Sequence, residues 1–201
     1  MKSSAGKVWA AMCRLITLLV LGGCVTYPIS YNDALPKVRG DLMEYPVFND
    51  QVTGIAVSHQ GRVFVTFPRW DNDPLYSVAE LLPDGSLRPY PDNGWNRWGT
   101  DELRHPTTHF VCVQSVTVDT NDDLWILDPA SPGFRGVVPG GAKLLRVNLS
   151  TDRVERVIPF DSEAAPRTSY LNDVRIDPAG DFAASMRRAR PIAVWCPRDN
   201  G

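Results

Sequence analysis

A hairpin-forming unit occurs twice in this chain and begins a third time. Residues 53–66 combine two short apolar runs around a turn, and residues 114–127 repeat that arrangement. Residues 172–183 start it once more, and there the pattern breaks. Because a repeat of about sixty residues built from short strands is typical of a β-propeller, we predict an all-β fold that forms part of one.

Each complete copy is followed by a second predicted hairpin. Residues 77–82 and 87–90 flank one turn, and residues 143–149 and 153–158 flank the other. These segments are short, and their apolar and polar residues alternate as in strands with one packed face. Two hairpins make one four-stranded blade, so we predict two complete blades and a third blade with only its first hairpin.

The arc of two and a half blades has two terminal sheets without a neighbour. In a propeller each sheet packs on the next, and ring closure covers the terminal faces. We therefore expect apolar sheet to be exposed at both ends of the arc. Self-association through these exposed blade edges is one predicted partnership.

Composition argues against a nucleic-acid partner. The chain has 21 Lys and Arg against 23 Asp and Glu, a formal net charge of −2, and no basic cluster that marks a phosphate-binding face. No pair of its four cysteines has metal-ligand spacing, and no disulfide framework is predicted. Cys112 lies in an apolar segment, where a free thiol is usually a small buried hydrophobe.

The first two dozen residues indicate an export signal. Basic residues precede an apolar run at 15–21, which has the length of a signal-peptide core and is too short to span a bilayer as a mature helix. Small residues then lead to Cys24. This looks like a bacterial lipobox, which implies cleavage before Cys24 and lipidation of its thiol. An ordinary secretory signal cut nearby is the alternative.

We divide the chain into four segments. Residues 1–23 are expected to be a lipoprotein signal helix, residues 24–45 a tether, residues 46–184 the partial propeller and residues 185–201 an aberrant or frameshifted tail. The tail is set apart because consecutive arginines and a proline do not continue a central strand. A genuine variant terminus, paired with another chain, is the alternative. We expect the mature chain to be extracytoplasmic and anchored to the membrane of a bacterial cell envelope through its lipid.

Residues 51–183 resemble the major royal jelly protein and Yellow family, including its bacterial members labelled as related to dopachrome tautomerase. Four segments carry the resemblance in the right order: 54–65, 123–128, 143–149 and 170–177. The family implies a six-bladed propeller, of which this chain covers about the first half. It also implies a small organic ligand bound in the propeller channel.

The chain is more distantly similar to the gluconolactonase and regucalcin group, which has the same ring and binds a divalent cation in its channel. Asn172 matches a ligand position of that group. Gln51 and Val52 stand near an expected glutamate, and Gln114 and Ser115 stand where the group has an asparagine. The resemblance thus implies calcium or another divalent cation at Asn172, although a lone asparagine does not hold Ca²⁺, which takes six to eight oxygen ligands.

Three polar residues at the starts of predicted innermost strands are the candidate channel ligands. Gln114 precedes the second such strand, and Asn172 and Asp173 begin the third. Such positions look into the channel of a propeller. The alternative is that Asp173 caps a turn and that the two amide side chains bond neighbouring backbone.

The loop at residues 92–105 is the richest surface candidate. Trp95 and Trp98, together with arginines and acids, would form one wall of an amphipathic pocket that stacks on an aromatic ligand. The alternative is that both tryptophans plug the gap between adjacent blades.

Metal and nucleophilic chemistry have weaker support. His105 and His109 have a spacing that suits a metal only on a helix, and Pro106 opposes a helix there. A catalytic triad of Ser115, His109 and Asp128 has the right residue types, but no segment of the sequence resembles a nucleophile elbow.

Three functions follow from these patterns. The first is an extracytoplasmic propeller of Yellow and royal jelly type that binds a small organic ligand. The second is an enzyme of gluconolactonase or dopachrome-isomerising type, and the third is a non-functional fragment. Ligand-induced stabilisation without turnover distinguishes the first from the second, and absence of soluble folded protein identifies the third.

Overall fold

The computed structural model describes residues 47–99, 105–186 and 194–196. They belong to the second of two compact units of the chain, Glu44–Gly201. The predicted signal helix at 1–23, the lipidation of Cys24 and the tether at 24–45 lie outside the described residues. Most of the predicted tail does so too.

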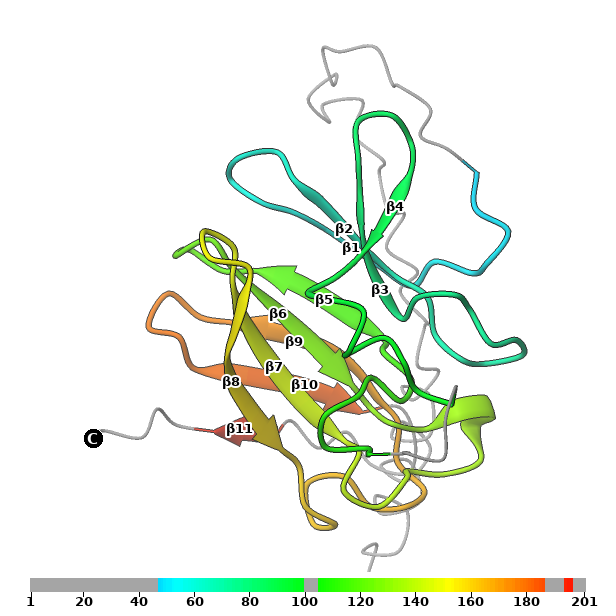
Figure 1. Cartoon of the computed structure of the whole chain (residues 1–201). Coiled ribbons are helices and arrows are strands. Elements are labelled where there is room, and N and C mark those ends of the chain that lie inside the picture. The colour runs from blue at the N-terminus through cyan, green and yellow to red at the C-terminus, as the bar shows by residue number, and fades with distance from the viewer. Residues whose placement is uncertain (1–46, 100–104, 187–193, 197–201) are drawn as a thin grey trace, which may run out of the picture. The chain divides into compact units, whose positions relative to one another are not determined.

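Three antiparallel sheets follow one another along the chain (Figure 1). The first, in the order β1-β2-β3-β4, contains β1 (Gly54–Val57), β2 (Val63–Thr66), β3 (Val78–Leu81) and β4 (Leu87–Pro89). The second, in the order β5-β6-β7-β8, contains β5 (Ser115–Val118), β6 (Asp123–Asp128), β7 (Lys143–Asn148) and β8 (Arg153–Pro159). The third, in the order β11-β10-β9, contains β9 (Leu171–Ile176), β10 (Phe182–Met186) and β11 (Val194–Cys196). The described residues contain no helix long and apolar enough to cross a membrane.

The prediction of an all-β partial propeller is confirmed, and both complete blades have their strands at the expected places. The third sheet differs from the prediction, which gave it a single hairpin. Its strand β10 continues past residue 184 to Met186, and β11 pairs with it. The physical reason for the difference is that strands pair through backbone hydrogen bonds, which do not require side chains to alternate. A register shift between Ser185 and Met186 accompanies this pairing. The frameshifted origin of the tail stays a prediction.

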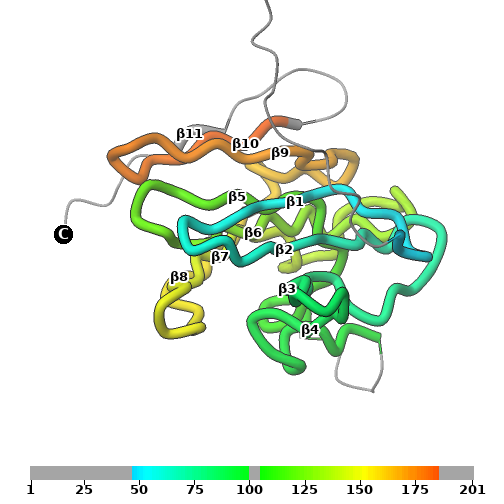
Figure 2. Tube along the Cα trace, turned by 90° about the horizontal axis from the view of Figure 1, so that it is seen from above, coloured from blue at the N-terminus to red at the C-terminus, as the bar shows by residue number. Residues whose placement is uncertain are grey.

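The first strands of the three sheets lie next to one another. Figure 2 shows β1, β5 and β9 close together and β4 and β8 farther out. Gly54 permits the approach of β1 to β5, because a Cβ there would lie 2.7 Å from Thr66 Oγ1 and 3.1 Å from the backbone nitrogen of Val116. On the other side of β5, Ser115 Oγ donates to Asp173 Oδ1 of β9 at 3.0 Å. This adjacency of first strands is the propeller arrangement.

The core consists of two layers on either side of β6. All six residues of β6 are buried. Leu124 and Ile126 pack into the layer toward the first sheet, whereas Trp125 and Leu127 pack into the layer toward the third. Successive side chains of a strand point to opposite faces, so one apolar strand joins both layers. Full burial of each such side chain contributes about 1.5–3 kcal/mol to stability.

The first sheet has an uncovered portion on its far face. Ala56 of β1 packs into the core, whereas its neighbours Ile55 and Val57 are 64% and 55% exposed. Strand alternation turns these two side chains away from the second sheet. Exposed apolar sheet at this end of the arc agrees with the expectation for an open ring. Self-association through it stays a prediction.

Candidate functional site

Long connections of the described residues meet at one end of the sheets, which we call the loop end. The strands β1, β5 and β9 all begin there, and neighbouring strands are antiparallel. The described connections 67–77 and 129–142 inside the first two sheets therefore lie at the loop end. So do residues 90–99, 105–114 and 160–170 between sheets. Short hairpin turns occupy the other end. The loop end is thus where side chains from all three sheets can converge.

Tyr170 joins three of these connections through its hydroxyl group. The hydroxyl accepts a hydrogen bond from Trp70 Nε1 at 2.7 Å and donates one to Gln114 Oε1 at 2.6 Å. The side chain is buried. Burial, followed by the neighbouring Cys112, raises the pKa of Tyr170, so the phenol keeps the proton that it donates. Tyr170 is therefore held in one orientation.

Phe134 completes an aromatic cluster with Trp70 and Tyr170. Its ring centroid lies 5.1 Å from that of Trp70 and 4.9 Å from that of Tyr170. Phe134 ends the short 3₁₀ helix η1 (Pro132–Phe134) and has a φ of 56°, which is uncommon for a residue with a side chain. The residue is 50% exposed. One part of this aromatic cluster therefore faces solvent.

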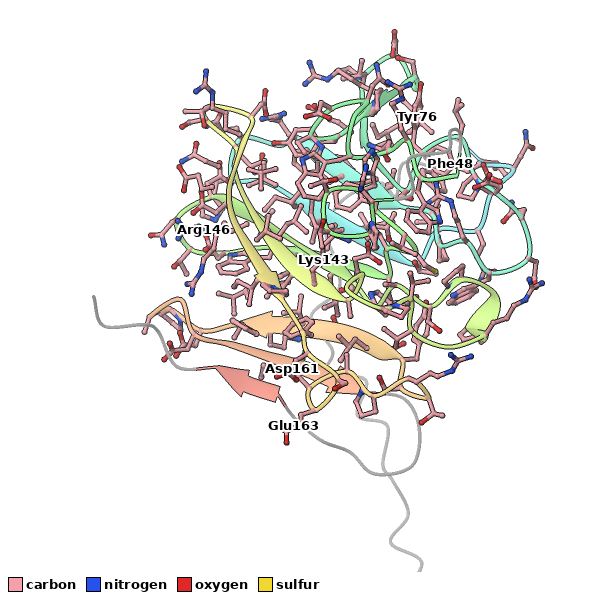
Figure 3. The ribbon with its side chains drawn as sticks, turned by 60° about the horizontal axis from the view of Figure 1, so that its bottom comes forward. Phe48, Tyr76, Lys143, Arg146, Asp161 and Glu163 are labelled. Atoms are coloured by element: carbon pink, nitrogen blue, oxygen red, sulfur yellow. The ribbon has the colours of Figure 1, made fainter. Side chains whose placement is uncertain are left out.

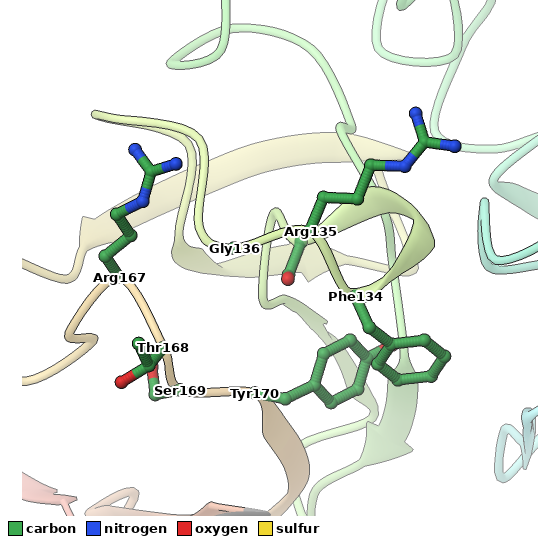
Figure 4. Close-up of a pocket in the computed structure, with 8 residues that line it drawn as sticks. Phe134, Arg135, Gly136, Arg167, Thr168, Ser169 and Tyr170 are labelled. Carbon is green, nitrogen blue, oxygen red and sulfur yellow. The ribbon is translucent and has the colours of Figure 1, made fainter.

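A hollow of about 600 Å³ opens beside this ring. Its lining includes Phe134, Arg135, Arg167, Thr168, Ser169 and Tyr170. Figure 4 shows the rings of Phe134 and Tyr170 next to each other, with the side chains of Arg135 and Arg167 extending from two separate loops. An adjoining hollow of about 560 Å³ shares both arginines and extends to Arg69, Trp70 and Trp98.

The two loops that carry the arginines are joined by their backbones. Val137 donates its N–H to the carbonyl oxygen of Arg167 at 2.9 Å. Gly136 has a φ of 109°, and a Cβ there would lie 3.0 Å from that same oxygen. Only glycine meets both demands without strain. The spacing of the two arginine-bearing segments is therefore set by main-chain contacts.

A buried ion pair between β6 and β7 holds part of the loop end in place. Lys143 Nζ, in a side chain that is 1% exposed, lies 2.8 Å from Asp128 Oδ2. The same ammonium group donates to the carbonyl oxygens of Pro106, His109 and Gly141. Asp128 also accepts the N–H groups of Val111, Cys112 and Ala130.

Figure 3 shows Lys143 inside the molecule, whereas Arg146, Asp161 and Glu163 lie farther out. Buried charges of this kind persist only when they are paired and hydrogen-bonded. Lys143 and Asp128 together tie residues 105–112 to β6 and β7.

The predicted channel residues have partners within the protein. Gln114 is buried, and its side-chain oxygen is occupied by Tyr170. Asp173 accepts the hydroxyl of Ser115 and its carboxylate lies 2.6 Å from Arg175 Nη1. Asn172 is exposed on β9. The structure thus brings Gln114 to the aromatic cluster and ties Asp173 to β5, while ligand binding by the three residues stays a prediction.

The two tryptophans of the 92–105 loop occupy different surroundings. Trp95 packs against the core between the first two sheets, with its ring centroid 5.3 Å from that of Phe110. Trp98 packs partly against the other core layer and also lines the adjoining hollow. Trp95 thus has the surroundings of a plug between blades, whereas Trp98 lines a hollow. Stacking of either ring on a ligand stays a prediction.

The structure also places the residues considered for a metal site and for a catalytic triad. Within the described residues, no group of three or more His, Cys, Asp or Glu side chains is placed to hold a metal ion. The hydroxyl of Ser115 is bonded to Asp173, and Asp128 is bonded to Lys143. Nδ1 of His109 lies 3.0 Å from the carbonyl oxygen of His105. Ser115, His109 and Asp128 therefore do not form the hydrogen-bonded chain of a triad.

Sequence reasoning missed Phe134, Arg135 and Arg167. They lie in connections that have no strand period and no motif, so no local pattern marked them. Tyr170 stood inside one of the segments that carry the family resemblance, directly before a predicted strand, and that was its only signal.

No protein-family model matches the chain, and no curated protein matches it either. Solved structures that resemble it include a protein of unknown function from Bacteroides caccae, with 13% identity and a TM-score of 0.44, covering 72% of this chain and 42% of that one. Virginiamycin B lyase from Staphylococcus aureus has 14% identity and a TM-score of 0.38, over 74% of this chain and 42% of that one.

A putative gluconolactonase has 13% identity and a TM-score of 0.43, and the match covers 72% of this chain and 48% of the gluconolactonase chain. The chain therefore spans less than half the length of these structures.

Proposed function

We propose that this chain is part of an extracytoplasmic propeller that binds a small organic ligand in the hollow at the loop end. The observation that carries the proposal is the hollow itself, bounded by Phe134 of the 129–142 connection and by Arg167 and Tyr170 of the 160–170 connection. Ligand sites are typically concave, partly aromatic and equipped with a few placed polar groups. A volume of about 600 Å³ suits a drug-sized molecule.

The floor of the hollow is organised before any ligand arrives. Tyr170 is held by hydrogen bonds to Trp70 and Gln114, and its ring supports Phe134. A preformed floor lowers the ordering cost of binding. Gln114 then serves the ligand indirectly, because it holds Tyr170 in position. This differs from the direct polar contact in the channel that the sequence predicts for Gln114.

The four sequence segments that resemble the royal jelly and Yellow family favour a ring of that type with six blades. A lactone-hydrolysing or isomerising enzyme is the alternative. Product formation by the purified chain, with a lactone or dopachrome as substrate, would favour the enzyme.

A fragment screen by ligand-observed NMR tests the binding proposal. We expect fragments with a flat apolar ring to bind, and Phe134→Ala to weaken them at least tenfold because the exposed ring face is lost. Val157→Ala removes a comparably exposed apolar side chain from the edge strand β8 and should leave binding unchanged. Absence of any hit, or hits that are insensitive to Phe134→Ala, would rule the site out.

We further propose that the chain is exported and anchored through a lipid on Cys24. The apolar run at 15–21 and the small residues before the cysteine support this. Detergent-phase partitioning of the expressed protein tests it. The wild type and Cys13→Ser should enter the detergent phase after processing, whereas Cys24→Ser should not. Equal partitioning of all three would contradict the anchor.

A further inference from the structure

We infer that the ligand of the loop-end hollow is a small organic anion, with its acidic group held by Arg135 and Arg167 and its apolar part against Phe134. The inference rests on the proposed binding function and names the ligand class. Three observations support it: the cavity, the positive charge of its lining and the exposure of the two arginines and of Phe134.

The charge of the lining has one sign. Arg135 and Arg167 both line the hollow and both are exposed. Among its described lining residues there is no aspartate or glutamate. Neither guanidinium group forms an ion pair with a carboxylate of the described residues. Two cations that have no carboxylate partner among the described residues make the opening attractive to anions.

The adjoining hollow does not reverse this sign. It shares Arg135 and Arg167 and adds Arg69, Asp71 and Asp73. Asp73 is already held by Arg69, whose Nε lies 2.6 Å from its Oδ1. Asp71 is then the one lining carboxylate of this second hollow, among its described residues, that can oppose the two rim arginines. The described linings of the two hollows together carry a net positive charge.

The residue types also favour an acid group over a cation. Arginine presents a planar fork of donors that matches a carboxylate or phosphate. Phe134 offers a half-exposed ring that suits a flat apolar group. A ring of this kind can also attract a cation, but repulsion by two guanidinium groups at the same opening works against one.

Three probes that share one skeleton test the inference in titrations of the full chain: 3-phenylpropionate, 3-phenylpropionamide and 3-phenylpropylamine. We expect the carboxylate to bind at least tenfold more tightly than the amide and the amine to bind most weakly. Arg135→Gln and Arg167→Gln should each weaken only the carboxylate, by about three- to tenfold. Arg153→Gln makes the same charge change at an exposed position where β8 begins and should have no effect.

A salt titration of the wild type gives a second measurement that needs no variant. Carboxylate binding should weaken as ionic strength rises, and amide binding should not. Equal binding of the three probes, tighter binding of the amine, or binding of none of them would overturn the charge assignment. The fragment screen decides separately whether the hollow takes neutral or cationic molecules, so failure of the ligand class is distinguishable from failure of the binding function.

Discussion

The phenol of Tyr170 donates a 2.6 Å hydrogen bond to the side-chain oxygen of Gln114, 56 residues earlier in the chain. The bond joins the segment that leads into β9 to the segment that leads into β5. Both groups are buried, so neither has water as a ready substitute. The floor of the hollow and the alignment of two inner strands therefore depend on the same pair.

Replacing Tyr170 by Phe should lower the free energy of unfolding by about 1–3 kcal/mol, because the buried oxygen of Gln114 is left without its donor. Urea denaturation followed by tryptophan fluorescence measures the change. Tyr76→Phe is the matched control: Tyr76 packs beside the outer face of the first sheet, and no hydrogen bond of its hydroxyl is found among the described residues. The control should change stability by less than about 0.5 kcal/mol, and an equal effect of both substitutions would contradict the role of the bond.

Lys143→Met should be severely destabilising, by about 3–5 kcal/mol, because it leaves the buried carboxylate of Asp128 without its cation. The midpoint of urea unfolding measures the loss of stability. If the variant does not fold, a reduced yield of soluble protein shows that the substitution is destabilising. Arg153→Met removes a positive charge from an exposed position and serves as the control. A loss for Lys143→Met no larger than that of this control would show that the pair does not support the loop end.

Glu80 should make the stability of the chain dependent on acid pH. Burial favours the neutral form of this carboxyl group, but hydrogen bonds from Arg62 and Arg88 outweigh it and lower the pKa of Glu80 below its ordinary value of 4.5. Arg62 contributes a bidentate contact, with Nε 2.9 Å from Oε1 and Nη2 3.0 Å from Oε2. A carboxylate with a lowered pKa in the folded state stabilises it above the unfolded pKa.

This contribution is therefore present above about pH 4.5 and is lost as the pH falls through the lower, folded-state pKa. Urea unfolding between pH 3 and pH 6 should show a shallower pH dependence for Glu80→Gln than for the wild type. Glu155→Gln, at a more exposed carboxylate that contacts Arg146, should keep the wild-type slope. Identical slopes for all three proteins would show that Glu80 does not carry the dependence.

Cys112 should resist alkylation in the folded protein. Burial, with a further contribution from Asp128, raises the pKa of its thiol to about 12, so almost no reactive thiolate exists at pH 8. Iodoacetamide treatment followed by peptide mass spectrometry should find Cys112 unmodified in buffer and modified in urea. Rapid modification under native conditions would mean that this segment opens, contrary to its packing between Asp128 and Tyr170.

The blades were predictable because their signals are local. Alternation along residues 153–158 and the turns between paired runs specify strands and hairpins without knowledge of any distant contact. The apolar run of β6 has no such alternation, and the structure gives the reason: both of its faces are buried. The end of the third repeat was less predictable, since pairing of β10 with β11 depends on backbone hydrogen bonds that side-chain pattern does not report.

The sequence alone thus determined the class of fold and the strands of two complete blades. It also singled out Gln114, whose role in ligand binding stays a prediction. Only the tertiary structure decided the candidate site. Trp70 and Tyr170 are 100 residues apart and meet through a hydrogen bond and a ring contact. Phe134 and Arg167 come from connections without any regular period. The physical reason is that strand formation follows from neighbours along the chain, whereas the hollow exists only once three sheets pack side by side and bring their loops to one end.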